Sequence, residues 1–134
     1  MKKIILLFIG TSIACCVNAQ SMLSKQWDKR YGGSLEEGVG AMIKTNDCGL
    51  LIGGHSDSGI SGDKSDTCRG LWDYWIIKLD SLGIKQWDKT FGGTQRERFT
   101  SIKQTNDGGY ILGGSTPSGM DGDKSEPSWG YEDY

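Results

Sequence analysis

Short runs of apolar residues alternating with polar ones recur along the chain and predict β-strands. The clearest run covers residues 73–80 and is followed by Ser81-Leu82-Gly83, a turn sequence. The sequence Asn106-Asp107-Gly108-Gly109 predicts a hairpin, because these residue types tolerate the backbone conformation of tight turns. One unit is therefore predicted to contain four strands, at 73–80, 84–91, 99–105 and 110–114.

Helices are not predicted after residue 19. No stretch there keeps a 3.6-residue periodicity, and the most helical one, residues 35–42, is interrupted by Gly38 and Gly40. Glycine accounts for 21 of the 134 residues, about twice its usual share. The predicted fold class is therefore all-β.

The chain contains an internal repeat with an offset of 60 residues. Gln26-Trp27-Asp28-Lys29 returns as residues 86–89, and Gly62-Asp63-Lys64-Ser65 returns as residues 122–125. Aligning residues 26–74 on 86–134 without gaps gives 22 identities in 49 positions. Such agreement predicts two copies of one structural unit.

Four short antiparallel strands per unit, with units in series, predict tandem blades of an incomplete, propeller-like β-repeat of about two blades. The predicted units are residues 20–72 and 73–134, with a third unit beginning at the end of the sequence and further repeats in a longer protein. Indole rings bury large apolar areas. Trp27, Trp75 and Trp87 are therefore the predicted contacts between blades.

The N-terminus has the pattern of a secretory signal peptide. Two lysines precede an apolar run, and Val17-Asn18-Ala19 supplies a cleavage site after residue 19. The alternative is a lipoprotein signal that ends at Cys15. The apolar run is too short for a stable transmembrane helix, so the predicted location is secreted or cell-surface.

Three segments resemble the repeat of secreted bacterial propeller-like proteins, which are common in Bacteroidetes and often carry a type IX secretion signal. These segments are WDKRYGGS at 27–34, DYWIIKLD at 73–80 and TNDGGYILGG at 105–114. The resemblance covers the whole chain after the signal peptide. It implies a propeller-like fold and export, and it implies no particular activity.

The segment DSLGIKQW at 80–87 is similar to the tryptophan-docking repeat of quinoprotein dehydrogenases. In that repeat an Asp, a Gly and a later Trp lock neighbouring blades together. The spacing here is one residue shorter, so the likeness is interpreted as shared blade packing and not as evidence for a quinone cofactor.

The net charge and the residue composition exclude some classes of function. The formal net charge is −2, which does not favour a nucleic-acid surface. No catalytic constellation is visible: His55 is the one histidine, and Glu36, Glu37 and Glu97 are interpreted as solubilising charges. No cofactor is predicted.

Two groups of residues could form sites that stabilise loops. Cys48 and Cys68 are the candidates for a disulfide, which would suit an oxidising compartment; the alternative is two independent thiols. Oxygen ligands on glycine-rich loops suit Ca²⁺. The weak calcium candidates are Asp57, Asp63, Asp121 and Asp123, and the alternative is that they are solvated turn residues.

The long polar loops carry aromatic residues that could face a ligand, namely Trp72, Trp129 and Tyr131. Stacking on sugar rings or packing on a protein partner would use such side chains; covering the blade rim is the alternative. The function predicted from the sequence is a non-enzymatic scaffold that binds an unidentified protein or glycan. The alternative is the scaffold portion of a secreted enzyme, either a glycan-processing or a quinoprotein-like propeller.

Overall fold

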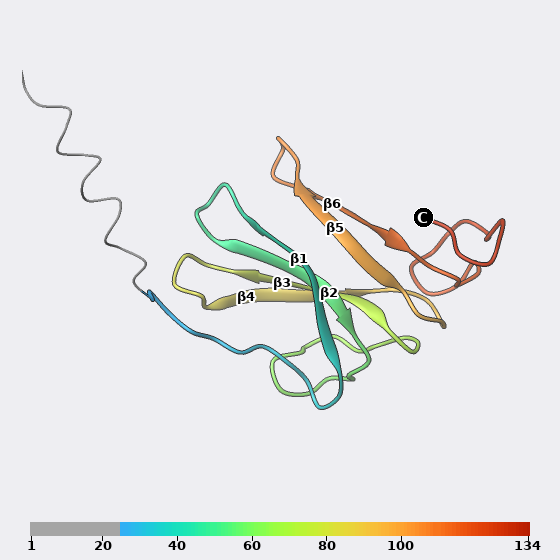
Figure 1. Cartoon of the computed structure of the whole chain (residues 1–134), viewed down its shortest axis with the longest axis horizontal. Helices are drawn as coiled ribbons and strands as arrows, with labels where there is room; N and C mark the ends of the chain where they lie inside the picture. Colours follow the sequence, from blue (N-terminus) through green and yellow to red (C-terminus); the bar gives the residue numbers. More distant parts are fainter. Residues whose placement is uncertain (1–24) are drawn as a thin grey trace, which may run out of the picture.

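The computed structural model describes residues 25–134, and this part of the chain folds entirely into strands and loops, without a helix (Figure 1). The prediction of an all-β fold is therefore confirmed. The predicted signal peptide at 1–19 and Cys15 lie outside the described residues. The six strands are β1 (Glu37–Lys44), β2 (Leu50–Ser56), β3 (Asp73–Leu79), β4 (Lys85–Phe91), β5 (Arg98–Gln104) and β6 (Tyr110–Ser115).

The strands form two antiparallel sheets. The first has the order β1-β2-β3-β4, and the second contains β5 and β6. The four-stranded sheet therefore takes two strands from each side of the boundary predicted at 72/73. A repeating sequence has no intrinsic starting point, so its period does not reveal which four consecutive strands share a sheet.

The two copies fold alike in detail. A bulge between Val39 and Ala41 in β1 returns between Phe99 and Ser101 in β5. The hairpin turns also match, since the Thr45 amide donates to the Gly49 carbonyl at 3.0 Å and the equivalent bond sixty residues later measures 2.9 Å. The internal repeat is thus a repeat of backbone geometry.

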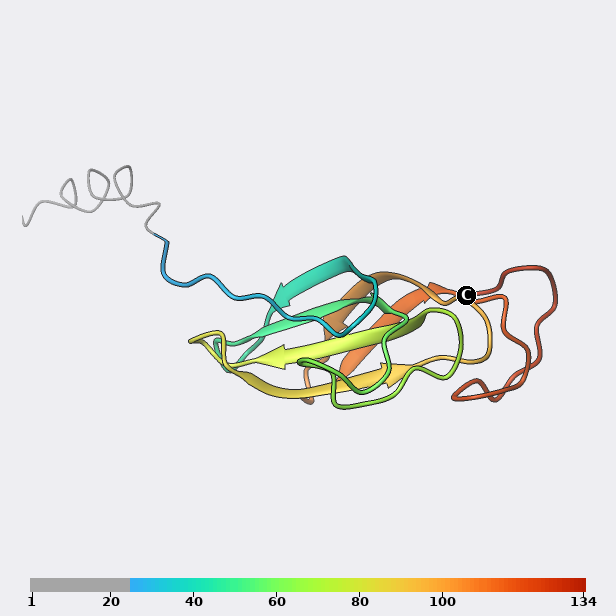
Figure 2. The ribbon, with the colours of Figure 1, turned by 90° about the horizontal axis from the view of Figure 1, so that it is seen from below.

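The four-stranded sheet has two apolar faces, which we name after a residue on each. The Leu51 face consists of Ala41, Ile43, Leu51, Tyr74 and Ile76, and β5 packs across it. The Trp75 face consists of Leu50, Ile52, Trp75, Ile77 and Leu79, and Trp27 and Tyr31 pack against it. Figure 2 shows the N-terminal segment on one side of the sheet and the β5–β6 pair on the other.

Glycine makes room for the second sheet on the Leu51 face. Phe99 of β5 is buried and lies over Gly53 of β2, where an added Cβ would come within 2.3 Å of its ring. The ring also meets Tyr74 edge-to-face, with 5.3 Å between centroids. A large aromatic side chain opposite a residue without a side chain fixes the position of β5 on this sheet.

Candidate functional site

Polar loops at one end of the sheets carry many ionisable side chains. In the first copy, the Gly32 amide donates to Asp63 Oδ2 at 3.2 Å, and the Asp63 amide donates to the Gly32 carbonyl at 2.8 Å. The same pair of bonds joins Gly92 and Asp123 at 3.1 and 3.0 Å. In each copy, these two hydrogen bonds thus hold the long loop against the Gly-Gly segment that precedes the first strand of that copy.

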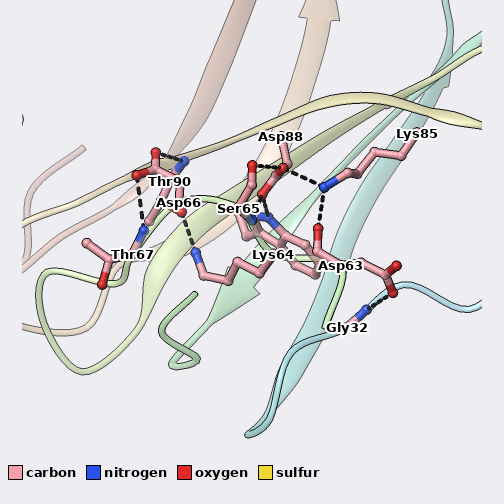
Figure 3. Close-up of polar contacts among 10 residues, drawn as sticks. Gly32, Asp63, Lys64, Ser65, Asp66, Thr67, Lys85, Asp88 and Thr90 are labelled. Carbon is pink, nitrogen blue, oxygen red and sulfur yellow. Dashed lines mark hydrogen bonds and ion pairs between the residues drawn. The ribbon is translucent and has the colours of Figure 1, made fainter. Parts of the chain in front are cut away.

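The loop that follows β2 is anchored to β4 by a buried lysine (Figure 3). Lys64 is almost completely buried, and its Nζ donates to Thr90 Oγ1. The same Nζ lies 5.7 Å from the centroid of the Trp75 ring, a favourable cation–π position. Burial lowers the pKa of Lys64, with nearby acidic groups opposing the shift.

Asp88 of β4 is the centre of this loop anchor. Its Oδ2 accepts hydrogen bonds from the Ser65 amide and from Trp75 Nε1, both at 2.9 Å. Its Oδ1 accepts from Ser65 Oγ at 2.5 Å and from Lys85 Nζ at 2.8 Å. Burial alone would raise the pKa of Asp88, but these hydrogen bonds outweigh it and lower the pKa to about 2. The carboxylate is therefore ionised and fully engaged, as expected of a structural anchor.

A second buried group lies where the two sheets meet. Glu97 precedes β5, and its Oε1 accepts hydrogen bonds from Thr116 Oγ1 at 2.9 Å and from Ser118 Oγ at 2.5 Å. Its Oε2 and Asp73 Oδ1 are buried oxygens without another hydrogen-bond partner. Burial raises the pKa of Glu97, and the adjacent Asp73 raises it further. The raised pKa thus favours a protonated Glu97, which can donate a hydrogen bond to Asp73.

We expect this carboxyl pair to make stability depend on pH. Because the pKa of Glu97 is higher in the folded protein, its favourable contribution is complete below its unfolded pKa, near 4.5, and is lost as pH rises through the raised value. In the Glu97→Gln variant, an amide would donate to Asp73 at every pH. The free energy of unfolding of the variant, measured with urea, should exceed that of the natural protein by about 1 kcal/mol at pH 8 and not at pH 4.

Glu37 supplies the matched control. It is the counterpart of Glu97, and its Oε1 accepts hydrogen bonds from Ser56 Oγ at 3.1 Å and Ser58 Oγ at 2.5 Å. The position sixty residues before Asp73 is Ile13, which has no carboxylate. Glu37→Gln should therefore not produce the pH-dependent gain, and equal profiles for the two variants would contradict a protonated Glu97.

Of the two alternatives for Cys48 and Cys68, the structure has two independent thiols and not the candidate disulfide, because both cysteines are free. Cys48 lies in the turn before β2, whereas Cys68 Sγ lies 3.4 Å from the carbonyl oxygen of Ser56, the last residue of β2. A seven-residue strand of about 20 Å separates these ends, and a disulfide needs Cα atoms within about 7 Å. Burial raises the pKa of the Cys68 thiol.

The calcium candidates are not brought into one cluster. Within residues 25–134, no three His, Cys, Asp or Glu side chains converge as a metal site would require. Asp57 and Asp121 instead accept hydrogen bonds from backbone amides, those of Glu36 at 2.8 Å and Thr94 at 3.1 Å. The four aspartates, including Asp63 and Asp123 of the loop clamps described above, close polar loops against the backbone.

The three tryptophans predicted to lie between blades occupy different environments. Trp75 is buried in the four-stranded sheet, with Trp27 packed against the same cluster. Trp87 of β4 is partly exposed and lies near Tyr110 of β6, with 6.1 Å between ring centroids. Trp87 therefore contacts the second sheet, whereas Trp75 belongs to the core of the first.

The aromatic residues of the long loops also differ. Trp72 is stacked on His55, with 4.6 Å between ring centroids, and the Arg96 guanidinium lies 4.6 Å from the Trp72 ring centroid. Its ring is thus occupied by protein contacts on two sides. Trp129 and Tyr131 are almost fully exposed on the loop after β6.

A cavity of about 340 Å³ opens on the Trp75 face and is a mainly apolar candidate for a binding surface. Its lining includes Tyr31, Val39, Ile52, Trp75 and Ile77.

No helix long and apolar enough to cross a membrane occurs among residues 25–134.

Sequence reasoning missed the buried ionisable residues. It interpreted Glu97 as a solubilising charge, and that interpretation is wrong because Glu97 is buried between the sheets. Because charged residues are usually exposed, the composition did not indicate that these residues are buried. A usable signal was the identity between copies, since Glu37 matches Glu97 and Lys64 matches Lys124.

Comparison with protein-family models gives no match, and comparisons with curated proteins and with solved structures give none either.

Proposed function

We propose that this chain is part of an exported, non-enzymatic scaffold in which sixty-residue units stack in series as propeller-like blades. In this proposal, residues 1–19 direct export, and the polar loops present exposed aromatic side chains to a protein or glycan ligand. The observation that carries the proposal is the way in which the second copy packs on the first.

That contact joins unlike faces of the repeat. Phe99, Ile102, Tyr110 and Leu112 of the second copy pack on the Leu51 face. Their counterparts in the first copy, sixty residues earlier, are Val39, Met42, Leu50 and Ile52, which belong to the opposite, Trp75 side of the sheet. A contact between unlike faces leaves a complementary face at each end, as in rings and open arrays.

Exposure on the first copy supports further stacking. Val39 is 77% exposed, whereas its counterpart Phe99 is 6% exposed. Met42 is also exposed, and the 340 Å³ cavity lies beside Val39. Among the described residues, the part of this surface around Val39 and Met42 is therefore open on the first copy, whereas Trp27 and Tyr31 cover another part of it.

The loops support the binding half of the proposal. Arg69 in the loop of the first copy forms an ion pair with Asp123 in the loop of the second, with 3.1 Å between Nη1 and Oδ2. The two loops therefore form a continuous polar surface, from which Trp129 and Tyr131 project with large exposed area. Aromatic rings on positioned loops suit stacking on sugars or packing on proteins.

The stacking proposal is tested by adding one more unit. Because Tyr134 is the counterpart of Tyr74, residues 75–134 are appended after Tyr134. The longer protein should unfold in one transition whose midpoint lies about 5–10 °C higher, since each added unit contributes a new interface. Calorimetry measures the midpoint.

A second extended protein distinguishes a gain in midpoint caused by stacking from a gain caused by chain length alone. In it, the added unit carries alanine at the position that corresponds to Phe99 and has otherwise the same sequence. This control should lose most of the gain in midpoint. Independent unfolding of the added unit, or an unchanged midpoint, would contradict the scaffold proposal.

A further inference from the structure

We propose that the outer edge of β6 is an acceptor site for an extended strand whose chemistry resembles that of β3, delivered as a hairpin of the β3–β4 type. The inference rests on the proposed function, because it names the kind of segment that completes the second sheet. Along β6 the described residues pair only with β5, apart from one bridge beyond its end.

A bridge within the chain already forms the first pair of the ladder that the incoming strand would continue. Thr116 and Asp133 form an isolated antiparallel bridge, with hydrogen bonds of 2.7 and 3.0 Å. Sixty residues earlier, Ser56 and Asp73 form the corresponding first pair of the β2–β3 ladder. The second copy therefore starts the same ladder in the same register, which fixes the direction of the acceptor edge as antiparallel.

The edge is bordered by an open groove of about 630 Å³, lined in part by Tyr74, Leu112, Gly113, Gly114 and Tyr134. Gly113 and Gly114 are the counterparts of Gly53 and Gly54, which pair with Ile76 and Trp75 of β3. At these two glycines the groove lacks side chains, and in the first copy the corresponding glycines lie beside the large side chains of a paired strand.

The carboxylate of Asp107, in the β5–β6 turn, indicates which side chain the incoming strand should carry at that end. In the first copy, Lys78 of β3 is buried, and its Nζ lies 2.8 Å from Asp47 Oδ2 in the β1–β2 turn. Hydrogen bonds from Lys78 and Thr45 hold the pKa of Asp47 well below its usual range. Asp107 is the counterpart of Asp47, and it forms no ion pair with any basic side chain in residues 25–134. The strand should therefore place a lysine near Asp107.

The second strand of the incoming hairpin is indicated by Lys124. Its counterpart, Lys64, is buried against Thr90 of β4 and the Trp75 ring. Lys124 is only partly buried and donates instead to the Ser118 carbonyl and Ser128 Oγ, both at 2.8 Å. A hairpin with the pattern of residues 75–91 would bring to Lys124 a tryptophan and a threonine like those that surround Lys64.

The test uses a synthetic peptide with the sequence of residues 75–91 as the probe, because Asp133 and Tyr134 already stand at the positions of Asp73 and Tyr74. Isothermal titration should show saturable, one-to-one binding to the full chain. Amide chemical-shift changes should be largest in residues 105–116. Asp107→Asn in the chain and Lys78→Gln in the peptide should each weaken binding about fivefold, and together no more than either alone, because both remove the same ion pair.

Asp28→Asn is the control, because it removes an exposed carboxylate of the same charge elsewhere. It should leave the affinity unchanged. Absence of binding, shifts centred on the Trp75 face, or equal effects of Asp28→Asn and Asp107→Asn would overturn the acceptor site. Such a result would leave the gain in midpoint of the longer protein intact, so the two proposals can fail separately.

Discussion

Phe99→Ala should lower the free energy of unfolding by about 3–4 kcal/mol, which is typical of a large buried aromatic residue. The Phe99 ring fills the space over Gly53 and contacts Tyr74 edge-to-face. Without the ring, the backbone of β2 would face a cavity, because glycine has no side chain that could fill it. Urea unfolding followed by tryptophan fluorescence measures the loss.

The same substitution should also loosen the second sheet before the first. β5 contacts the four-stranded sheet along β1, β2 and β3, so amide hydrogen exchange in β5 and β6 should accelerate more than exchange in β2 and β3. Val39→Ala is the matched control at the corresponding position of the first copy, where the side chain is exposed. Its effect should stay within about 0.5 kcal/mol, and similar losses for both variants would refute the docking role of Phe99.

Asp88→Asn should be the most damaging polar substitution, costing about 2–4 kcal/mol. The amide has nearly the same shape as the carboxylate, but it brings an NH₂ donor to a position surrounded by donors. With the amide oxygen at the Oδ2 position, the Ser65 amide and Trp75 Nε1 keep their acceptor, but the NH₂ group then faces the ammonium group of Lys85, which is also a donor. Thermal unfolding at neutral pH measures the effect.

The pH dependence of this variant provides a second measurement. Because the pKa of Asp88 is lowered to about 2, its stabilisation is present above the unfolded value, near 3.8, and is lost as pH falls through about 2. The natural protein should therefore lose stability between pH 4 and pH 2 more steeply than the Asp88→Asn variant.

The control for Asp88 is again its counterpart in the repeat. Asp28 forms an ion pair with Lys25 at 2.7 Å, as Asp88 does with Lys85, but both partners are exposed. Exposed ion pairs contribute little, so Asp28→Asn should change stability by less than about 0.5 kcal/mol. A comparable loss would show that the ion pair, and not the buried hydrogen bonds, supports β4.

The strands were largely predictable from local pattern. The predicted strand at 73–80 corresponds to β3, and the one at 99–105 corresponds to β5 within one residue at each end. Alternation and turn chemistry act over a few residues, so they are visible in the sequence. The turn at Cys48 is an instructive case: this residue has a φ of 66°, and glycine stands at the same place in the second copy.

Long-range arrangement was not predictable in the same way. The distance along the sequence between Cys48 and Cys68 did not reveal that they lie at opposite ends of β2. Likewise, the burial of Lys64 depends on Thr90 and Trp75, which belong to strands encoded later in the chain. Such contacts arise from the pairing of whole strands, and no local pattern specifies them.

The contact between unlike faces has a consequence for how such a gene can change. If a whole sixty-residue segment is inserted or lost by recombination, each surviving junction still joins the same two surfaces. The aromatic residue at the position of Phe99 would still meet the glycine at the position of Gly53, whichever units become neighbours. Differences in length between related genes should therefore come in multiples of sixty codons.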